Sequence, residues 1–483
     1  MRINNNKKII KILKSSLVAG AIFFTSACVN SNVSNQKKNS KGISQAVLKQ
    51  VNTPSIRLKP YKEMTLENGL KIIFVEDFSL PTMELSLLVK VGQRNETKSN
   101  LGINYFAANL LEQGTSALDA NQLADELASL GTELDISTGI DFTTISIDGL
   151  TLSAEKIIDL YTEILFKPAF KEAELQKKKN QVLAQLKKIQ DSPSGVANMK
   201  MNQIYFQDSV FAFPVFGNEK SIKSIKRSEL IKHFLKFYRP NNSTLAVTGA
   251  ISEELESKIV EVFKVWPSRQ VEASTENITF QPPLKKYFVS YKKGLVQSEI
   301  RMTQPLFPRN HPDFLKMRIA NEVLGGSFVS RLNSKIRDQL GLTYSISSQV
   351  DHRKDLGTLD ISTFTKVDST RKVIDQIEGE LSAFITSGIS AKEMASVKNL
   401  LMAQFPRVLE TVNAFAFNLM YLDFNEISYS YLSDYYKNIE KITLEEVNLA
   451  IKNNLSLDKV KFFIYTDPKA KTQFGDKELV NQL

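Results

Sequence analysis

The chain has 483 residues, of which 42% are hydrophobic and 24% charged, so it can bury large cores and form two or more domains. Its formal net charge is +10, but five of the 62 basic residues lie between Arg2 and Lys14; without them 57 basic residues face 52 acidic ones, a net charge of +5. That excess is too small to indicate a nucleic-acid partner, and the single cysteine, Cys28, excludes an intramolecular disulfide.

The N-terminal segment has the features of a bacterial lipoprotein signal. Its basic residues are followed by the short apolar run "SLVAGAIFF" and by "TSAC", which resembles a lipobox ending at Cys28. We therefore predict a signal peptide over residues 1–27, lipidation of Cys28 as the membrane anchor and, from the Ser, Asn and Lys content, a flexible tether over residues 28–58. Such a protein is expected in the bacterial cell envelope as a periplasmic lipoprotein, and Val29 favours the outer membrane.

The residues after the tether predict alternating strands and helices. "MTLENGLKIIFVED" alternates around an Asn-Gly turn and predicts a hairpin, and "MELSLLVKVG" predicts a third strand. A helix is expected within residues 101–116, followed by an amphipathic helix capped by Asp119 and ended by Gly131. Two strands, two long helices within residues 154–190, a helix near Ile231 and a buried strand complete this half.

The order of elements then starts again. Residues 266–286 are polar and contain prolines, which predicts a linker. After it come the strand "QSEIRMTQPLF", two helices, two strands, long helices and a last helix and strand that repeat the end of the first half. This repetition indicates an internal duplication. We predict an α+β fold with two homologous domains, residues 59–265 and 287–483, each an antiparallel-rich mixed sheet packed with helices.

The sequence lacks the usual catalytic motifs. No two of its histidines, His233, His311 and His352, lie within one helical turn, as a helical zinc site would require. His311 precedes Pro312 in a predicted loop and is expected at the surface. There is no second cysteine, nucleophile elbow or phosphate-binding lysine motif.

The order of elements nevertheless resembles that of the insulinase and mitochondrial-processing-peptidase family of zinc peptidases. In this family an inverted zinc-binding motif, "HxxEH", lies on a helix. In that family the helix reads Gly, two residues, His-x-x-Glu-His, four residues and Gly-Thr, and Gly102 and Gly114–Thr115 match this frame. The family's third zinc ligand is a Glu in a later helix that contains "VxxE". In this chain "VLAQ" aligns with that segment and places Gln185 at the position of the Glu. The resemblance thus implies an insulinase-like fold in which all four functional positions are substituted, namely Tyr105, Ala108, Asn109 and Gln185.

These substitutions remove the chemistry. Ala108 cannot accept a proton from water, and Asn109 and Gln185 offer neutral amide oxygens, which are poor zinc ligands. Tyr105 would have to lose a proton with a pKa near ~10. No histidine precedes His233, so a shifted alignment does not restore the motif. We predict that this chain binds no metal cofactor and is inactive alone.

A second motif is intact. "SRLNSKIRDQLGLTYSISS" matches the family's motif of an Arg and a Tyr seven residues apart, here Arg337 and Tyr344. In the family this pair binds substrate backbone carbonyls near the metal, and both side chains can donate to an oxyanion. From the residues alone, the simpler interpretation is that Arg337 is a solvated helix residue and Tyr344 a packed residue at a strand start.

The resemblance implies a division of labour between two chains. We expect a non-catalytic, substrate-binding subunit of a heterodimeric zinc metallopeptidase that acts on peptides, with zinc held by a partner chain bearing the zinc motif. The alternative is a peptide-binding or scaffold pseudoenzyme lipoprotein without a role in proteolysis. A stand-alone enzyme with an unusual metal site is disfavoured by the lost base at Ala108.

Overall fold

The computed structural model describes residues 56–271, 282–474 and 480–481. The predicted signal peptide, the lipidation site at Cys28 and nearly all of the predicted tether therefore lie outside the described residues. Among the helices of the described part, none combines the length and the apolar character that a membrane span requires.

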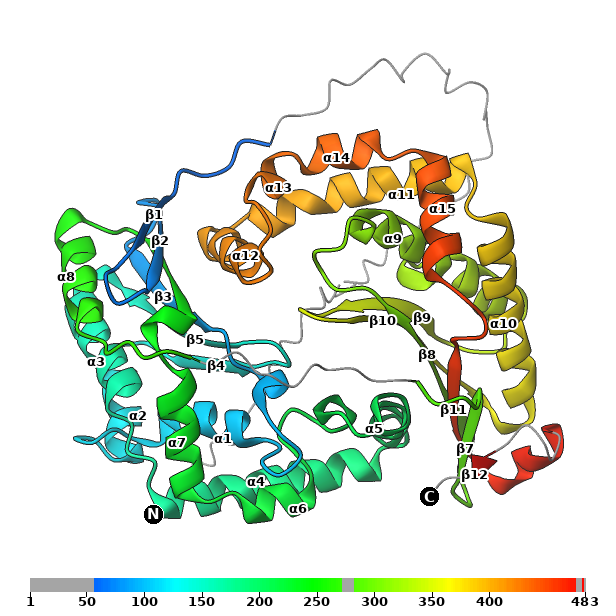
Figure 1. Ribbon diagram of the computed structural model, residues 1–483, viewed down its shortest axis with the longest axis horizontal. Coiled ribbons are helices and arrows are strands. Elements are labelled where there is room, and N and C mark those ends of the chain that lie inside the picture. Colours follow the sequence, from blue (N-terminus) through cyan, green and yellow to red (C-terminus); the bar gives the residue numbers. More distant parts are fainter. Residues whose placement is uncertain (1–55, 272–281, 475–479, 482–483) are drawn as a thin grey trace, which may run out of the picture. The chain divides into compact units, whose positions relative to one another are not determined.

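The first sheet has six strands in the described residues (Figure 1). In spatial order they are β1 (Lys62–Thr65), β2 (Lys71–Glu76), β6 (Ser243–Gly249), β3 (Thr82–Val89), β5 (Thr143–Leu150) and β4 (Leu134–Thr138). The predicted hairpin is β1–β2, and the parallel pair β2–β6 makes the otherwise antiparallel sheet mixed. At the hairpin turn Gly69 has a φ of +87°, a conformation that favours glycine.

The second sheet repeats this topology. Its order is β12 (Val480–Asn481), β7 (Tyr287–Tyr291), β11 (Lys461–Thr466), β8 (Gln297–Leu306), β10 (Gly357–Lys366) and β9 (Ile346–His352). The series β2, β6, β3, β5, β4 and the series β7, β11, β8, β10, β9 agree in order and in strand direction. The two-sheet α+β architecture expected from the sequence is confirmed.

One face of the first sheet packs against helices of its own half. These helices are α1 (Ile103–Asn109), α2 (Ala120–Ser129), α3 (Ala154–Phe166), α4 (Glu172–Asp191), α6 (Glu219–Ser224), α7 (Arg227–Phe237) and α8 (Glu253–Lys264). Alternate residues of β3, including Leu85 and Leu87, face this core. The predicted cap of α2 is present, because the Asp119 carboxylate accepts hydrogen bonds from the backbone N–H groups of Asn121 and Gln122.

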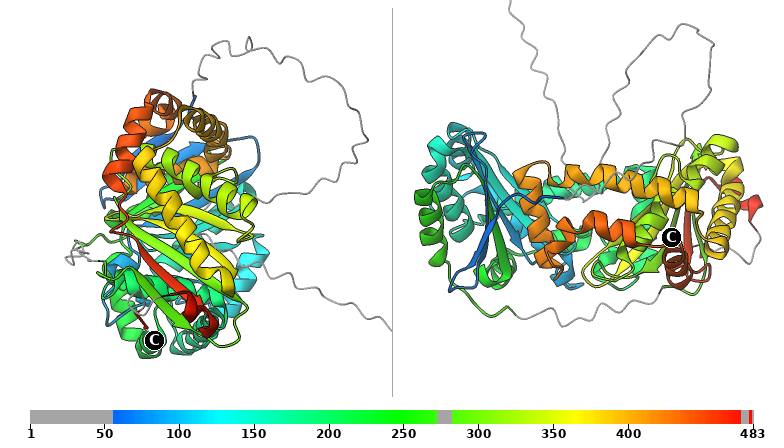
Figure 2. Two further views of the ribbon diagram at one scale, coloured as in Figure 1. Left: turned by 90° about the vertical axis from the view of Figure 1, so that its right-hand side faces the viewer. Right: turned by 90° about the horizontal axis from the view of Figure 1, so that it is seen from above.

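The second half packs in a related way, with α10 lying across a face of its sheet (Figure 2). Its helices are α9 (Phe314–Asn321), α10 (Thr370–Ser387), α11 (Ala391–Gln404), α13 (Ser430–Ser433), α14 (Tyr435–Lys441) and α15 (Leu444–Asn454). The two regular helices predicted between β8 and β9 differ from the structure, because π-helical turns occupy Glu322–Gly326 and Asn333–Gln339. A wider turn of this kind has no signature in a 3.6-residue pattern.

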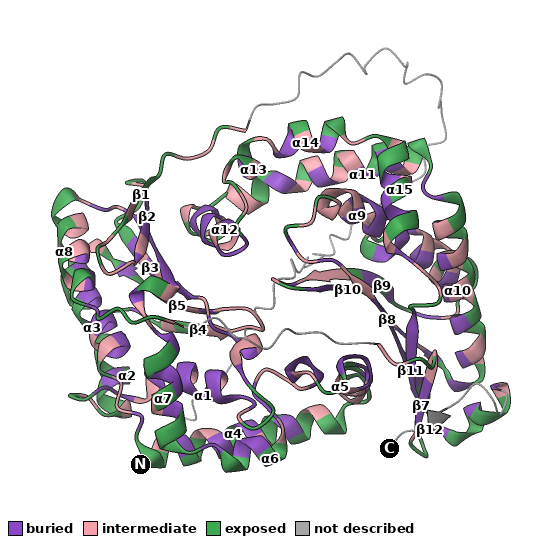
Figure 3. Cartoon of the chain, viewed as in Figure 1, coloured by how far each residue is buried: buried purple, intermediate pink, exposed green. Residues whose placement is uncertain are grey.

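Each sheet also receives one helix from the other half of the sequence. Helix α12 (Val412–Phe424) packs on β2, β3 and β6 of the first sheet, where Ile73 and Leu88 belong to its apolar cluster. Helix α5 (Pro193–Phe206) packs on β8 and β11 of the second sheet, with Met201 in the cluster of Phe463. Figure 3 shows how much of α12 is buried by these contacts.

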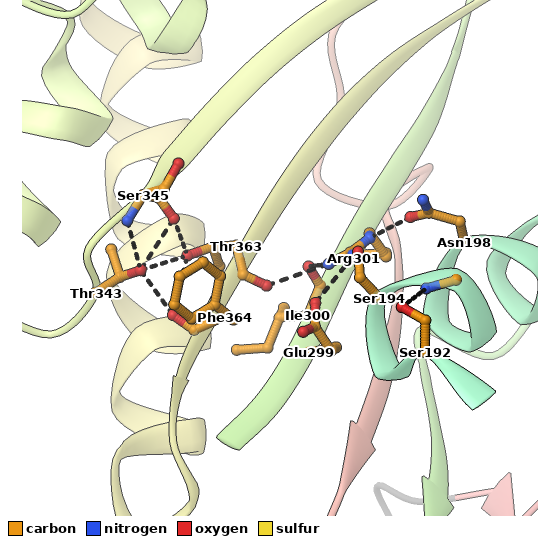
Figure 4. A network of polar contacts seen from close by, with 11 residues as sticks. Ser192, Ser194, Asn198, Glu299, Ile300, Arg301, Thr343, Ser345, Thr363 and Phe364 are labelled. Carbon is orange, nitrogen blue, oxygen red and sulfur yellow. Dashed lines mark hydrogen bonds and ion pairs between the residues drawn. The ribbon is translucent and has the colours of Figure 1, made fainter. Parts of the chain in front are cut away.

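A charged residue anchors each exchanged helix. The Asp423 carboxylate at the end of α12 lies 3.0 Å from Lys71 Nζ and 3.4 Å from Lys90 Nζ, and it accepts a hydrogen bond from the Thr244 hydroxyl at 3.1 Å. In the second half, the buried Arg301 guanidinium on β8 donates to Ser194 and Asn198 of α5 (Figure 4). Charge-assisted hydrogen bonds of this kind are about twice as strong as neutral ones.

The anchor at Asp423 gives a pH-dependent stability. Burial opposes ionisation, but Lys90 and Lys71 outweigh it and lower the Asp423 pKa below its ordinary value. A lowered folded-state pKa stabilises the protein above the unfolded-state pKa of about 3.9, and the stabilisation is lost as the pH falls through the folded-state value. We expect Asp423→Asn to lower the free energy of unfolding by about 2 kcal/mol at pH 7 and to have a much smaller effect at pH 3. Circular dichroism melting at both pH values measures this.

The matched control is Asp375→Asn, which removes the surface ion pair with Arg371 within α10. Exposed pairs contribute less than about 1 kcal/mol, so this variant should melt close to wild type. Equal melting temperatures of the two variants at pH 7 would contradict the anchoring role of Asp423.

Candidate functional site

Helix α1 carries the three clustered positions that the family motif indicates, and its start is fixed by a buried carboxylate. Glu96 accepts hydrogen bonds from the backbone N–H groups of Gly102 (2.7 Å) and Asn104 (3.0 Å). Gly102 has a φ of +87°, and a Cβ there would collide with the carbonyl of Phe216. The glycine of the motif frame is therefore required by the backbone, independently of any metal.

The aligned residues on α1 are poorly suited to bind a metal. Ala108 is fully buried, and the side-chain amide of Asn109 donates to the backbone carbonyl of Tyr105 at 2.9 Å. The half-buried Tyr105 ring packs edge-on against Phe216, with 6.0 Å between the centroids. Burial and the nearby Glu112 carboxylate raise the pKa of the Tyr105 phenol, which makes the phenolate ligand harder to form.

The fourth aligned residue, Gln185, is exposed on α4. On the same helix, Lys178 forms an ion pair of 2.9 Å with Glu112, which follows α1. The donor set of one phenol and two amides does not fit zinc, which prefers imidazole, thiolate and carboxylate ligands. Across the described ranges, no three His, Cys, Asp or Glu side chains are grouped closely enough to hold a metal ion.

His233 of α7 contacts α1 in a structural role. Its Nε2 lies 3.3 Å from the side-chain oxygen of Asn104, which also accepts a hydrogen bond from the Tyr238 hydroxyl at 3.2 Å. Burial, with a smaller effect from Lys236, lowers the pKa of His233 to about 3, so the ring is neutral at pH 7. This neutral histidine helps to fix the helix that carries the motif frame.

The other two histidines lie in the second half. His311 lies in a loop as expected, but it is half-buried because its ring stacks on Phe307 with 4.0 Å between the centroids. His311 thus stays partly exposed, in the loop expected from the sequence. His352 Nδ1 lies 2.9 Å from the Phe307 carbonyl oxygen, and burial lowers the pKa of His352 to about 4.

The donor set at Tyr105, Asn109 and Gln185 gives a direct prediction about metal removal. We expect the purified chain to contain far less than one zinc ion per molecule by mass spectrometry and to melt at the same temperature with and without EDTA. A structural or catalytic zinc would add stability that a chelator removes. Stoichiometric zinc, or a melting temperature lowered by EDTA, would contradict this description of the site.

Arg337 lies in the second π-helical turn and is half-buried. Its guanidinium carbon lies 4.0 Å from the ring centroid of Phe328, and its Nε lies 3.1 Å from the carboxylate of Asp338. Cation–π contact and the ion pair together restrain the side chain. Arg337 therefore differs from a freely solvated helix residue.

Tyr344 projects into solvent, with 82% of its surface exposed. The residues on both sides of it, Thr343 through its hydroxyl and Ser345 through its backbone, belong to a hydrogen-bond network (Figure 4). The single proton of the Thr343 hydroxyl lies within reach of the carbonyls of Phe364 (2.6 Å) and Ser345 (2.9 Å), and its oxygen accepts from the Ser345 N–H. The Thr363 hydroxyl lies within hydrogen-bond distance of the Thr343 hydroxyl and the Ser345 carbonyl. This network fixes the backbone so that Tyr344 points outward instead of packing at the strand start.

Arg337, in the second π-helical turn, and Tyr344, in the connection from that turn to β9, thus lie close together in the chain. Gly341, with a φ of +59°, lies between them. Among the described residues, no hydrogen bond, ion pair or ring contact joins the two side chains; the Arg337 side chain is restrained by Phe328, and the backbone at Tyr344 is restrained by Thr343.

The Thr343 network predicts a stability effect. Thr343→Val keeps the side-chain shape but removes the hydroxyl that donates to the Phe364 carbonyl and accepts from the Ser345 N–H, at a cost of about 1–3 kcal/mol. We expect a melting temperature several degrees below wild type. The matched control is Ser347→Ala on β9, where the hydroxyl is exposed and its loss should change little; an equally small effect at Thr343 would show that the network does not hold this segment.

Comparison with known proteins identifies the family. Residues 71–218 match the family described as insulinase (peptidase family M16), and residues 224–401 match the peptidase M16 inactive domain. The first match contains α1 and the aligned residue Gln185, and the second contains Arg337 and Tyr344. Together the matches span most of the chain, which belongs to the M16 (insulinase) peptidase family.

Individual relatives differ in what their names state. The chain is 24% identical over 353 residues to the uncharacterized zinc protease YmxG of Bacillus subtilis, covering 73% of this chain and 85% of that protein. It is 25% identical over 403 residues to the non-peptidase homolog YmxG of Helicobacter pylori, covering 82% and 92%. A solved M16 inactive domain from Pseudomonas fluorescens has the same fold, with a TM-score of 0.77 at 23% identity over 84% of this chain and 98% of that one.

Sequence reasoning missed several residues that support the site. Glu96 and His233 fix α1 from outside the motif, and Phe328 stacks on Arg337. Phe328 lies within the matched motif region, so it could have been noticed, although nothing in its spacing indicates the contact. Glu96 and His233 carry no sequence signal, because their partners lie on other elements.

Proposed function

We propose that this chain is the non-catalytic, substrate-binding subunit of a heterodimeric zinc metallopeptidase that acts on peptides. The observation that carries the proposal is the combination of two sites within one M16 fold. The helix that would hold zinc has Tyr105, Ala108 and Asn109, whereas Arg337 and Tyr344 are present and held in place. A chain with donors for the substrate and no base needs a partner that supplies metal and base.

The two donors suit the binding of a peptide backbone. A guanidinium and a phenol both donate hydrogen bonds and both can stabilise a developing oxyanion. The exposed phenol of Tyr344 is accessible to a ligand without rearrangement of the core. We propose that the substrate adds as an extended strand at a sheet edge, for which β4, next to α1, and β9, next to the Arg337 segment, are the candidates.

The site assignments and the anchor are part of the same proposal. Tyr105, Ala108, Asn109 and Gln185 are proposed to be the degenerate zinc positions, with zinc held by a zinc-motif-bearing M16 partner. The lipid on Cys28 is proposed to keep the complex at the membrane of the cell envelope, and the two halves are proposed as domains over residues 59–265 and 287–483.

A second candidate is a peptide-binding or scaffold protein that takes no part in proteolysis. It is favoured by the name of the Helicobacter pylori relative, a non-peptidase homolog, and by the M16 inactive-domain match over residues 224–401. The two candidates differ in one consequence. Only the subunit proposal requires Arg337 to matter for turnover by a partner.

The test is reconstitution with a zinc-motif-bearing M16 chain, first sought next to this gene. Neither chain alone should cleave an unfolded peptide, and the mixture should. We expect Arg337→Ala to lower kcat/KM at least about tenfold and Tyr344→Phe to lower it less, because loss of one donor to an oxyanion costs about 10²–10³-fold in well-studied sites. Size-exclusion chromatography should show the complex intact.

The control is Arg269→Ala, which removes an exposed arginine that follows α8. It should leave both complex and activity unchanged. Peptide cleavage that survives Arg337→Ala and Tyr344→Phe without loss would favour the scaffold candidate, and zinc-dependent cleavage by this chain alone would overturn both.

A further inference from the structure

Two large apolar side chains are exposed in the segment that precedes Arg337, and one of them contacts it. Phe328 and Val329 lie in the connection between the two π-helical turns, and 70% and 83% of their surfaces are exposed. Neighbours in the same segment, Leu324 and Leu332, are almost completely buried in the core. Burial of Phe328 and Val329 therefore contributes little to folding, which leaves their side chains available for a ligand.

The Phe328 ring also sets the direction in which Arg337 can donate. A guanidinium 4.0 Å above a ring is within cation–π distance, and its N–H groups lie in its own plane. Asp338 binds the Nε side at 3.1 Å. Among the described residues, Asp338 is the one polar partner recorded for this guanidinium, so the Nη groups remain for a ligand.

This arrangement selects a particular kind of peptide. Suppose that an Nη group of Arg337 donates to a backbone carbonyl of the substrate peptide. The next substrate residue then lies within about 4 Å along the peptide, and its side chain is close to the exposed Phe328 ring. Phe328 and Val329 offer apolar and aromatic contact there. The half-exposed Asp338 carboxylate repels an acidic side chain at the same place.

We infer that Phe328, together with Val329, forms the subsite that selects a large apolar side chain next to the carbonyl bound by Arg337. This inference rests on the proposed function and adds a substrate class to it, unfolded peptides with an aromatic or large aliphatic residue and no acid at that position. Phe328 is thus a specificity-determining residue that also positions Arg337.

The experiment uses the reconstituted pair and three peptides that differ at one residue, Phe, Ala or Glu, at the cleavage site. The wild-type pair should prefer the Phe peptide over the Ala peptide and the Ala peptide over the Glu peptide. In Phe328→Ala the Phe-to-Ala ratio of kcat/KM should fall about tenfold, mainly through KM, since a lost apolar contact changes selectivity by about 10–200-fold. The ratio cancels any loss common to both peptides, including one caused by a displaced Arg337.

Two further variants make the result specific. Phe328→Trp should keep the preference for the Phe peptide, because it keeps an aromatic face. Leu152→Ala, which trims a leucine that is 94% exposed in the first half, should leave the ratio unchanged.

The outcomes separate the subsite from the function on which it rests. A wild-type pair that cleaves none of the peptides overturns the proposed function and the subsite with it. An active wild-type pair with no Phe preference, or with a preference that Phe328→Ala does not alter, overturns the subsite alone. A lowered ratio in Phe328→Ala with a retained ratio in Leu152→Ala supports it.

Discussion

The exchange of helices α5 and α12 between the two halves is the constraint on which the structure depends. A sheet that packs helices on one face leaves an apolar second face, and here that face is covered by a helix from the other half of the sequence. Apolar burial supplies most of the driving force, and Asp423 and Arg301 fix the two helices with charged hydrogen bonds. Neither sheet is complete on its own.

A second set of contacts explains how the fold persists without the catalytic groups. Helix α1 is held by Glu96 at its start and by the contact between Asn104 and His233, and none of these residues belongs to the zinc motif. Removing imidazoles and a carboxylate from positions 105, 108 and 109 therefore leaves the helix in place, with Ala108 packed in the core. The contacts that hold the helix of the motif do not involve the metal-ligand and base positions. A sequence can therefore keep the helix and lose the catalytic groups.

The parts that could be predicted from the sequence are those with a local cause. The alternation of β3, the Asn-Gly turn of the first hairpin and the Asp119 cap all depend on neighbours in the chain. Helices α5 and α12 were missed because the burial of each is decided by the other half, so α12 is apolar around most of its circumference and shows no single face.

The candidate site divides in the same way. The substituted positions on α1 and the Arg337–Tyr344 spacing could be found in the sequence, because a motif is defined by the order and spacing of residues along the chain. The exposure of Tyr344 could not, because it depends on hydrogen bonds between Thr343 and Thr363, which lie on different elements. The stacking of Phe328 on Arg337 likewise follows from π-helical turns that have no sequence period.

The exchanged helices have a consequence for how such a chain can evolve and fold. Because each half completes the other, a duplicated gene of this type cannot be cut at residues 266–286 into two stable proteins without exposing an apolar sheet face on each. Synthesis on the ribosome must also finish α12, far along the chain, before the first sheet is closed on both faces. The nascent first half therefore has a period of exposure in which a chaperone would be of use.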